Sequence, residues 1–139
     1  MEKILFLDFD GVLHSTTSCP EKMFSQAEPL AEVLVKNPCS IVISSSWRFH
    51  YSLDEIKERL PPSMRDLIQG ATGEPYIGKW PRYNEIKEFL IKNRLYVDWR
   101  ALDDSFLEFP THCQELILCQ GKNGFTVKEQ EILESWLES

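Results

Sequence analysis

The stretch that decides the fold is Ile4–Leu13, which reads ILFLDFDGVL. Four apolar residues are followed at once by acid, aromatic, acid and glycine. Such a run predicts a short buried strand whose carboxyl end opens into a turn. Because an open parallel sheet binds its ligands beyond the carboxyl ends of its strands, we expect the chemistry of this protein at Asp8 and Asp10.

The spacing of these two aspartates favours a bound cation. If the strand's period of two continues, Asp8 and Asp10 point to the same side and Phe9 to the other. Two carboxylates about 4 Å apart repel by about 4 kcal/mol at an effective dielectric constant of about 20. A hard divalent metal is the simplest way to relieve that repulsion. The alternative is a solvated turn, since Asp and Gly are ordinary turn residues.

Composition and charge narrow the class of protein. The chain has 139 residues, 42% of them hydrophobic, which fits a single domain spanning 1–139. Its net charge of −7 argues against non-specific binding to nucleic acid or to an anionic membrane. We expect a cytoplasmic protein, because Met1 leads directly into the first strand and no apolar run approaches the roughly 20 residues of a membrane span. The four cysteines lack metal-ligand spacing and are expected to be reduced and mostly buried.

The rest of the chain alternates helical and strand patterns. Strands are expected at 4–7, 41–43, 97–102 and 116–119, and helices at 29–36, 53–60, 82–93 and from Thr126 onward. The segment 63–81 is expected to be a long connection with a short helix at about 64–69. Strands alternating with helices imply right-handed crossovers and a three-layer α/β/α fold with a parallel sheet.

Polar groups follow two further expected strands. Ser44–Ser46 and Arg48 come after 41–43, and Asp103–Asp104 come after 97–102. If these strands are neighbours of the first, the polar groups share one rim with its two aspartates. Carboxylates can bind Mg²⁺ there, while hydroxyls and a cation hold phosphoryl oxygens, which predicts a phosphoryl-transfer site. Alternatively, the serines only start a helix and Arg48 pairs with an acid.

Three further residues are candidates near this rim. Lys79 and Arg82 lie at the start of the helix 82–93, where a cation opposes the helix dipole and therefore suggests an anion nearby, although a solvated cation is the default. His14 lies just past the acidic loop. It contacts either the substrate or, more commonly for a histidine, solvent or a hydrogen-bond partner.

Together these segments resemble the haloacid dehalogenase superfamily of aspartate-nucleophile phosphohydrolases. The first, second and fourth motifs of that superfamily are similar to Asp8–Val12, Ile41–Ser45 and Leu102–Asp104. The chain also resembles a compact subgroup related to domains of RNA-repair proteins, through Ser45–Arg48, Arg82–Ile86, Leu102–Asp104 and Gly124–Thr126. The implied fold is a Rossmann-like sheet.

The resemblance implies a role for each candidate. Asp8 would attack phosphorus and become an aspartyl-phosphate, and Asp10 would protonate the leaving oxygen and then deprotonate water. Mg²⁺ would be held by the Asp8 carboxylate, the Asp10 carbonyl and either Asp103 or Asp104.

Two roles in binding the substrate phosphate remain open between alternatives. The second-motif hydroxyl would be Ser45, with Ser44 as second choice. The third-motif cation would be Arg82 or Lys79, and the subgroup's Arg-x-x-Glu-Ile pattern favours Arg82.

Neither 14–27 nor 63–81 is long enough for the full cap domain of many relatives. An open site suits a phosphate on something large, such as a nucleic-acid end or a protein, and a small phosphomonoester also remains open.

The predicted function is a Mg²⁺-dependent phosphatase, a hydrolase. The main alternative is a catalytically inactive module of the same fold that binds metal or phosphate. A receiver-like domain is disfavoured. In such a domain the acids and the phosphate acceptor lie on different strands, whereas Asp8 and Asp10 lie two residues apart after one strand.

Overall fold

Five parallel strands form the centre of the molecule. The structure is a computed structural model that describes residues 1–139. The sheet has the order β3-β2-β1-β4-β5, with strands β1 (Lys3–Leu7), β2 (Ser40–Ile43), β3 (Ile68–Ala71), β4 (Asp98–Asp103) and β5 (Leu116–Leu118). The chain builds outward from β1 through β2 to β3, then returns to add β4 and β5 on the other side. The direction of winding therefore reverses between β1 and β4, which is where such sheets bind ligands.

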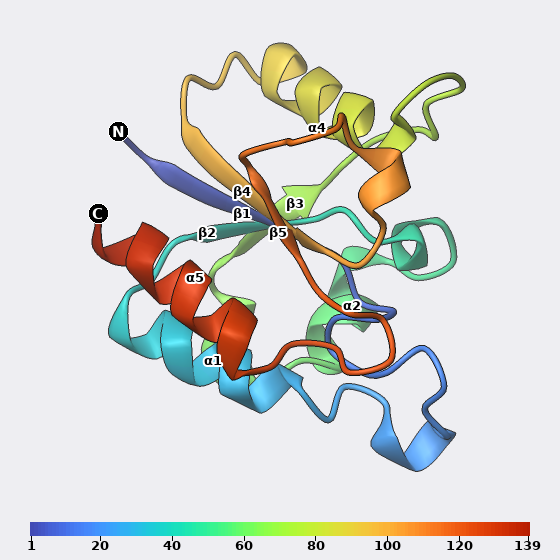
Figure 1. Cartoon of the computed structure of the whole chain (residues 1–139), viewed down its shortest axis with the longest axis vertical. Coiled ribbons are helices and arrows are strands. Elements are labelled where there is room, and N and C mark those ends of the chain that lie inside the picture. The colour runs from blue at the N-terminus through green and yellow to red at the C-terminus, as the bar shows by residue number, and fades with distance from the viewer.

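Helices cover both faces of this sheet (Figure 1). They are α1 (Ala27–Lys36), α2 (Leu53–Glu58), α3 (Pro62–Arg65), α4 (Pro81–Lys92) and α5 (Val127–Glu138). Short 3₁₀ turns lie at η1 (Pro20–Lys22), η2 (Ser46–Phe49) and η3 (Phe106–Glu108). Helices α1 and α5 lie on one face and α4 on the other (Figure 1). The predicted three-layer α/β/α architecture is confirmed.

The alternation of side chains along β1 builds two cores. Leu5 and Leu7 pack with α1, α2 and α5 residues in the larger buried cluster. Ile4 and Phe6 pack with α4 residues in the smaller one. Because successive strand residues point to opposite faces, one apolar run supplies both layers.

Two predicted helix starts carry the expected caps. The Ser52 hydroxyl accepts the Glu55 N–H at 3.2 Å, and the Glu55 carboxylate accepts the Ser52 N–H at 3.0 Å. At α5 the Glu129 carboxylate accepts both the backbone N–H and the hydroxyl of Thr126. These bonds satisfy backbone donors that a helix start leaves free.

The segment 63–81 differs from the prediction. The expected helix at 64–69 is wrong, because α3 ends at Arg65 and Ile68–Ala71 forms strand β3. This edge strand pairs with β2, and only Ile68 in it is buried. Its sequence, Ile-Gln-Gly-Ala, has no apolar alternation, so pairing with β2 rather than local propensity makes it a strand.

No separate cap domain follows β1 or β2. None of the helices has the length and apolar character needed to cross a membrane. The four cysteines are free, and Cys39 and Cys119 are buried whereas Cys19 is exposed.

Candidate active site

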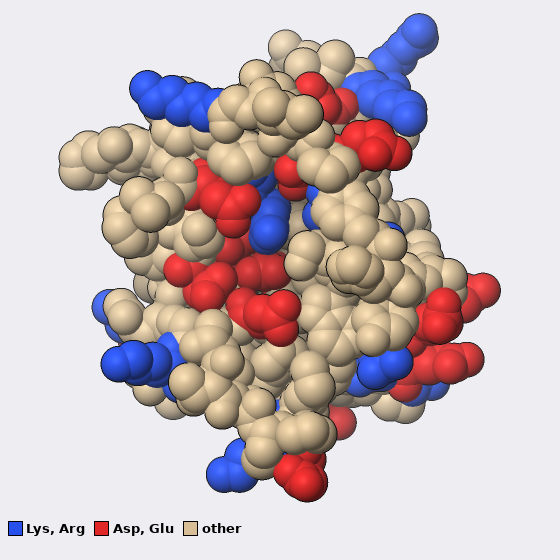
Figure 2. Space-filling model, turned by 90° about the vertical axis from the view of Figure 1, so that its right-hand side faces the viewer, with Lys and Arg blue, Asp and Glu red and all other residues tan.

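Polar residues from four strands meet at the carboxyl edge of the sheet. The strand pairing continues one residue past β1, β2 and β3, because the N–H groups of Asp8, Ser44 and Thr72 donate to carbonyls of neighbouring strands at 2.9–3.1 Å. This fixes each side chain at the same edge as Asp103, the last residue of β4. Acidic side chains gather in the centre of this face and surround a basic one (Figure 2).

Three acids form the centre of the site. One carboxylate oxygen from each of Asp8, Asp103 and Asp104 lies within 4.8 Å of the others. Asp8 and Asp103 are buried, and Asp104 is partly buried. The structure therefore brings together the acids that the sequence places at the ends of two different strands.

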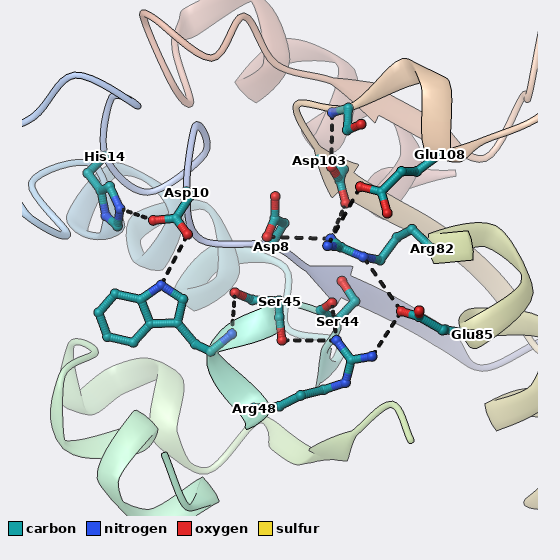
Figure 3. A network of polar contacts seen from close by, with 12 residues as sticks. Asp8, Asp10, His14, Ser44, Ser45, Arg48, Arg82, Glu85, Asp103 and Glu108 are labelled. Carbon is teal, nitrogen blue, oxygen red and sulfur yellow. Dashed lines mark hydrogen bonds and ion pairs between the residues drawn. The ribbon is translucent and has the colours of Figure 1, made fainter. Parts of the chain in front are cut away.

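Arg82 lies against this acidic group (Figure 3). Its Nη1 is 2.6 Å from Asp103 Oδ2 and 3.4 Å from Asp8 Oδ1, and its Nη2 is 3.9 Å from Glu108 Oε2. It lies in the first turn of α4, so the anions that its position suggested are side chains of the protein itself.

Lys79, the other candidate cation, lies outside the site. It is exposed, and its Nζ lies 4.9 Å from the centre of the Trp80 ring. Trp80, the residue before α4, has a left-handed backbone with φ of 53°, so the chain changes direction between Lys79 and Arg82. Of the two cations, only Arg82 contacts the acids.

Burial and mutual repulsion shift the titration of these groups. Burial raises the pKa of Asp8 well above its usual range, repulsion from Asp103 adds to this, and Arg82 opposes it. Burial also raises the pKa of Asp103 to about 6, again against the effect of Arg82. Burial alone lowers the pKa of Arg82, but the surrounding carboxylates raise it above its ordinary value. Three acids around one arginine leave excess negative charge, which favours a cation.

Asp10 lies apart from the three acids. Its side chain is 54% exposed, and its Oδ1 is 2.7 Å from His14 Nε2. The indole N–H of Trp47 donates to Oδ2 at 3.2 Å. The expectation that the Asp8 and Asp10 carboxylates lie close together is not confirmed: Asp10 is not among the acids whose oxygens lie within 4.8 Å of one another, and its carboxylate contacts His14 and Trp47 instead.

Gly11 lets the chain turn after Asp10. Its φ is 77°, in the left-handed region that favours glycine. A Cβ at this position would also collide with the Asp104 carboxylate. The glycine of the first motif therefore both turns the chain after Asp10 and leaves space for an acid of the fourth.

The two candidate hydroxyls are buried beside the acids. Ser45 Oγ accepts the Trp47 N–H at 3.2 Å and caps η2, and its hydroxyl proton remains available. Ser44 Oγ has no hydrogen-bond partner, and neither does Thr72 Oγ1 on the neighbouring strand. Buried hydroxyls without partners are uncommon, so the Ser44 and Thr72 hydroxyls stand out among the polar groups at this edge of the sheet.

The Arg48 guanidinium is bound by groups of the protein itself. Its guanidinium donates to the carbonyls of Ser44, Ser45 and Gly73 at 2.8–3.1 Å. It also pairs with Glu85 at 2.9 Å. The alternative in which Arg48 pairs with an acid is therefore the one that the structure shows.

Sequence reasoning gave no role to three polar residues of the site, although Glu85 belongs to the Arg-x-x-Glu-Ile pattern. Glu85 binds Arg48 and also accepts the Tyr76 N–H at 3.0 Å; its position three residues after Arg82 on one helix face was an available signal. Glu108 lies in η3, whose sequence carries no such signal. Thr72 was missed because β3 was missed.

The comparisons agree with this geometry. A family model described as the HAD (haloacid dehalogenase) domain in Swiss Army Knife RNA repair proteins matches residues 4–130. A search of curated proteins and a search of solved structures gave no match. The matched range contains β2 to β5, all of β1 except Lys3, and the whole acidic group. The chain therefore belongs to the family of HAD domains found in Swiss Army Knife RNA repair proteins, a branch of the HAD-like superfamily.

Proposed function

We propose that this protein is a Mg²⁺-dependent phosphomonoesterase that works through an aspartyl-phosphate on Asp8. The observation that carries the proposal is the group formed by the buried Asp8 and Asp103 and the partly buried Asp104. Their oxygens lie within 4.8 Å of one another, and Arg82 is the cation in contact with the group. Such a group is costly without a further cation. It is well suited to a reaction in which negative charge must be held close to phosphorus.

The donor set fits Mg²⁺, which prefers oxygen ligands. Asp103 is already engaged, because one oxygen pairs with Arg82 and the other accepts the Ser105 N–H at 3.0 Å. The Asp104 carboxylate makes no ion pair with a cation of the chain, and the Asp10 carbonyl accepts no backbone hydrogen bond. We therefore assign the metal to Asp8, Asp104 and the Asp10 carbonyl. Bound Mg²⁺ would neutralise excess charge and polarise the phosphoryl oxygens.

The residues of the chain account for both halves of the reaction. An Asp8 oxygen attacks phosphorus, so an O–P bond forms while the bond from phosphorus to the ester oxygen breaks, and Asp10 gives that oxygen its proton. Asp10 then takes a proton from water, whose oxygen attacks phosphorus. Inorganic phosphate leaves and the Asp8 carboxylate is restored. Arg82 and the Ser44 and Ser45 hydroxyls hold the oxygens that do not react.

For the substrate we propose a phosphate at a nucleic-acid end. The site lacks a cap domain, and the matching family is named for RNA repair proteins. Because the net charge is −7 and the face around the site is acidic (Figure 2), we expect affinity to come from the terminal phosphate rather than from contacts along the backbone. Phosphorylated proteins and small metabolites are the competing substrates.

Turnover of an aryl phosphate tests the reaction. We expect Mg²⁺-dependent release of phosphate, and a loss of at least about 10³-fold in Asp8→Asn, because the amide oxygen is a poor nucleophile. Asp54→Asn, a change at an exposed aspartate of α2, is the matched control and should keep full activity. Unchanged activity in Asp8→Asn would refute the nucleophile.

A substrate screen separates the remaining possibilities. Oligonucleotides with a 5′- or a 3′-phosphate are compared with phosphopeptides and phosphorylated metabolites by kcat/KM. Preference for one class of oligonucleotide end supports the proposed substrate. If Mg²⁺ and vanadate bind but no phosphoester is cleaved, the inactive module becomes the better description.

A further inference from the structure

The chain folds back after Asp10 so that His14 lies beside it (Figure 3). The Gly11 N–H donates to the His14 carbonyl at 2.9 Å, and a bridge pairs Asp10 with His14. His14 is only 3% exposed, although the Asp10 side chain that it contacts is 54% exposed. A buried group therefore holds a carboxylate that faces the solvent.

The direction of this hydrogen bond is fixed by a backbone group. The Phe24 N–H donates to His14 Nδ1 at 3.3 Å, so Nδ1 acts as the acceptor. The ring proton then lies on Nε2, which donates to Asp10 Oδ1 at 2.7 Å. Trp47 donates to the other oxygen, Oδ2. Both oxygens of Asp10 are held by donors that carry no formal charge in this arrangement.

Aromatic packing keeps these donors in place. The Phe24 ring packs edge-on against both His14 and Trp47, with centroids 5.3 and 5.2 Å apart. Phe9, which is fully buried, contacts Phe24 and Trp47 in the same way. Tyr51 stacks on Trp47 with ring centroids 5.0 Å apart. Such a cluster restricts the rotamers of His14 and Trp47.

We infer that His14 is a positioning residue that fixes the orientation of Asp10 for proton transfer to the leaving oxygen, with Trp47 as its counterpart on the second carboxylate oxygen. This inference rests on the proposed function, in which Asp10 is the acid and base. An exposed carboxylate without these two donors samples several rotamers, and displacement of a catalytic group by about 1 Å can cost about 10²-fold in rate.

A pair of substitutions at His14 tests this orientation. In His14→Asn the amide nitrogen reaches only the place of Nδ1, so the bond to Asp10 is lost, whereas His14→Gln carries its amide nitrogen to the place of Nε2. We expect His14→Asn to lower kcat/KM for an alkyl phosphate about 10- to 100-fold and His14→Gln to recover most of the loss. Circular dichroism and thermal unfolding monitor the fold of both.

A comparison of two leaving groups distinguishes a positioning role of His14 from a purely structural one. A nitrophenyl leaving group departs without a proton, and kcat/KM reports only the steps up to its departure. His14→Asn should therefore change kcat/KM for nitrophenyl phosphate by less than about 3-fold. An equal loss for both substrates, or no loss for either, would overturn the inference.

A third variant keeps the test decisive if His14→Asn does not fold. Trp47→Phe preserves the aromatic packing and removes only the indole N–H. It should show the same dependence on the leaving group, with a loss of about 3- to 10-fold for the alkyl phosphate; equal losses for both substrates would contradict the inference. Asp8→Asn, assayed in parallel, separates the two claims: if it remains active, the proposed function fails, and if it alone is inactive, only the positioning role fails.

Discussion

Asp8 and Asp10 are the same residue type two positions apart, yet their surroundings are opposite. Asp8 is 6% exposed and lies among charged groups, with Arg82 at 3.4 Å and Asp103 and Asp104 close by. The Asp10 side chain is 54% exposed and is bound by an imidazole and an indole. The Asp8 N–H still takes part in the pairing of the sheet, whereas Asp10 lies beyond it, where the chain folds back toward His14.

This difference shows how one short motif can supply two kinds of chemistry. A carboxylate among fixed charges, with a cation bound, suits attack on phosphorus. A carboxylate that reaches water and is held by neutral donors suits repeated proton exchange. Environment rather than residue type divides the roles, as it does in other enzymes that use two carboxylates.

Removing Arg82 should disrupt the charged surroundings of Asp8 and leave the hydrogen bonds of Asp10 intact. We expect Arg82→Met to lower kcat/KM about 10³-fold, because the buried acids lose their counter-charge and the phosphoryl oxygens lose a donor pair. Arg82→Lys keeps the charge but not the planar fork, so its loss should be smaller, at about 10- to 100-fold.

Lys79→Met is the matched control for Arg82, since Lys79 is exposed and contacts only the Trp80 ring as a cation. It should stay within about 2-fold of the unaltered protein. A loss as large as that of Arg82→Met would show that the wrong cation has been assigned.

The pH dependence of stability should distinguish the surroundings of Asp8 from those of Asp10, because of the two only Asp8 lies among buried acids. Burial raises the pKa of Asp103 from its ordinary 3.8 to about 6, and the pKa of Asp8 moves in the same direction. Between those pH values the folded protein binds more protons than the unfolded chain. The free energy of unfolding of the metal-free protein should therefore fall as pH rises, by about 3 kcal/mol from Asp103.

Urea unfolding in EDTA between pH 4 and pH 7.5 measures this effect. Asp103→Asn should reduce the slope, and Mg²⁺ should restore stability at the upper end of the range. An unchanged slope in Asp103→Asn would show that this carboxyl keeps an ordinary pKa.

Metal affinity should distinguish the two adjacent acids of the fourth motif. Asp104→Asn should weaken Mg²⁺ binding about 10- to 100-fold, whereas Asp103→Asn should weaken it only about 3-fold, because Asp103 is engaged by Arg82 and the Ser105 N–H. Isothermal titration calorimetry on the two variants measures the difference. The reverse order would exchange the roles of these residues.

The smallest effect is expected at the Gly11 turn, which follows Asp10. Gly11→Ala forces a Cβ into a left-handed backbone and against Asp104, and should lower the free energy of unfolding by about 1–2 kcal/mol. Gly70→Ala is the control, because a Cβ there meets nothing within 4 Å. It should change stability by less than about 0.5 kcal/mol, and equal effects of the two changes would contradict the role of the Gly11 turn.

The fold could be predicted where local patterns are strong. The buried run of β1 and the caps at Ser52 and Thr126 are local signals, and the structure follows them. Strand β3 could not be predicted, because it exists through its pairing with β2 and buries only Ile68.

The features of the site also differ in how far the sequence predicts them. The convergence of Asp8 with Asp103 follows from strand ends alone, whereas the preference for Arg82 over Lys79 came from the Arg-x-x-Glu-Ile pattern of the family that the chain resembles. The different surroundings of Asp8 and Asp10 depend on where the pairing of the sheet ends and on the fold-back of the chain from Asp10 to His14. The choice of Nε2 as the donor of His14 depends on the Phe24 N–H ten residues later, a contact that only the folded chain creates.

The most direct test is to find the phosphoryl group on Asp8. In Asp10→Asn, an aryl phosphate can still transfer its phosphoryl group because its leaving group needs no proton, but the phosphoenzyme lacks the base for its hydrolysis and should accumulate. After an acid quench, borohydride reduces an aspartyl-phosphate to homoserine, which peptide mass spectrometry locates. Homoserine at position 8 is the predicted result, whereas an unmodified Asp8 or a phosphoryl group on another residue would contradict the proposed mechanism.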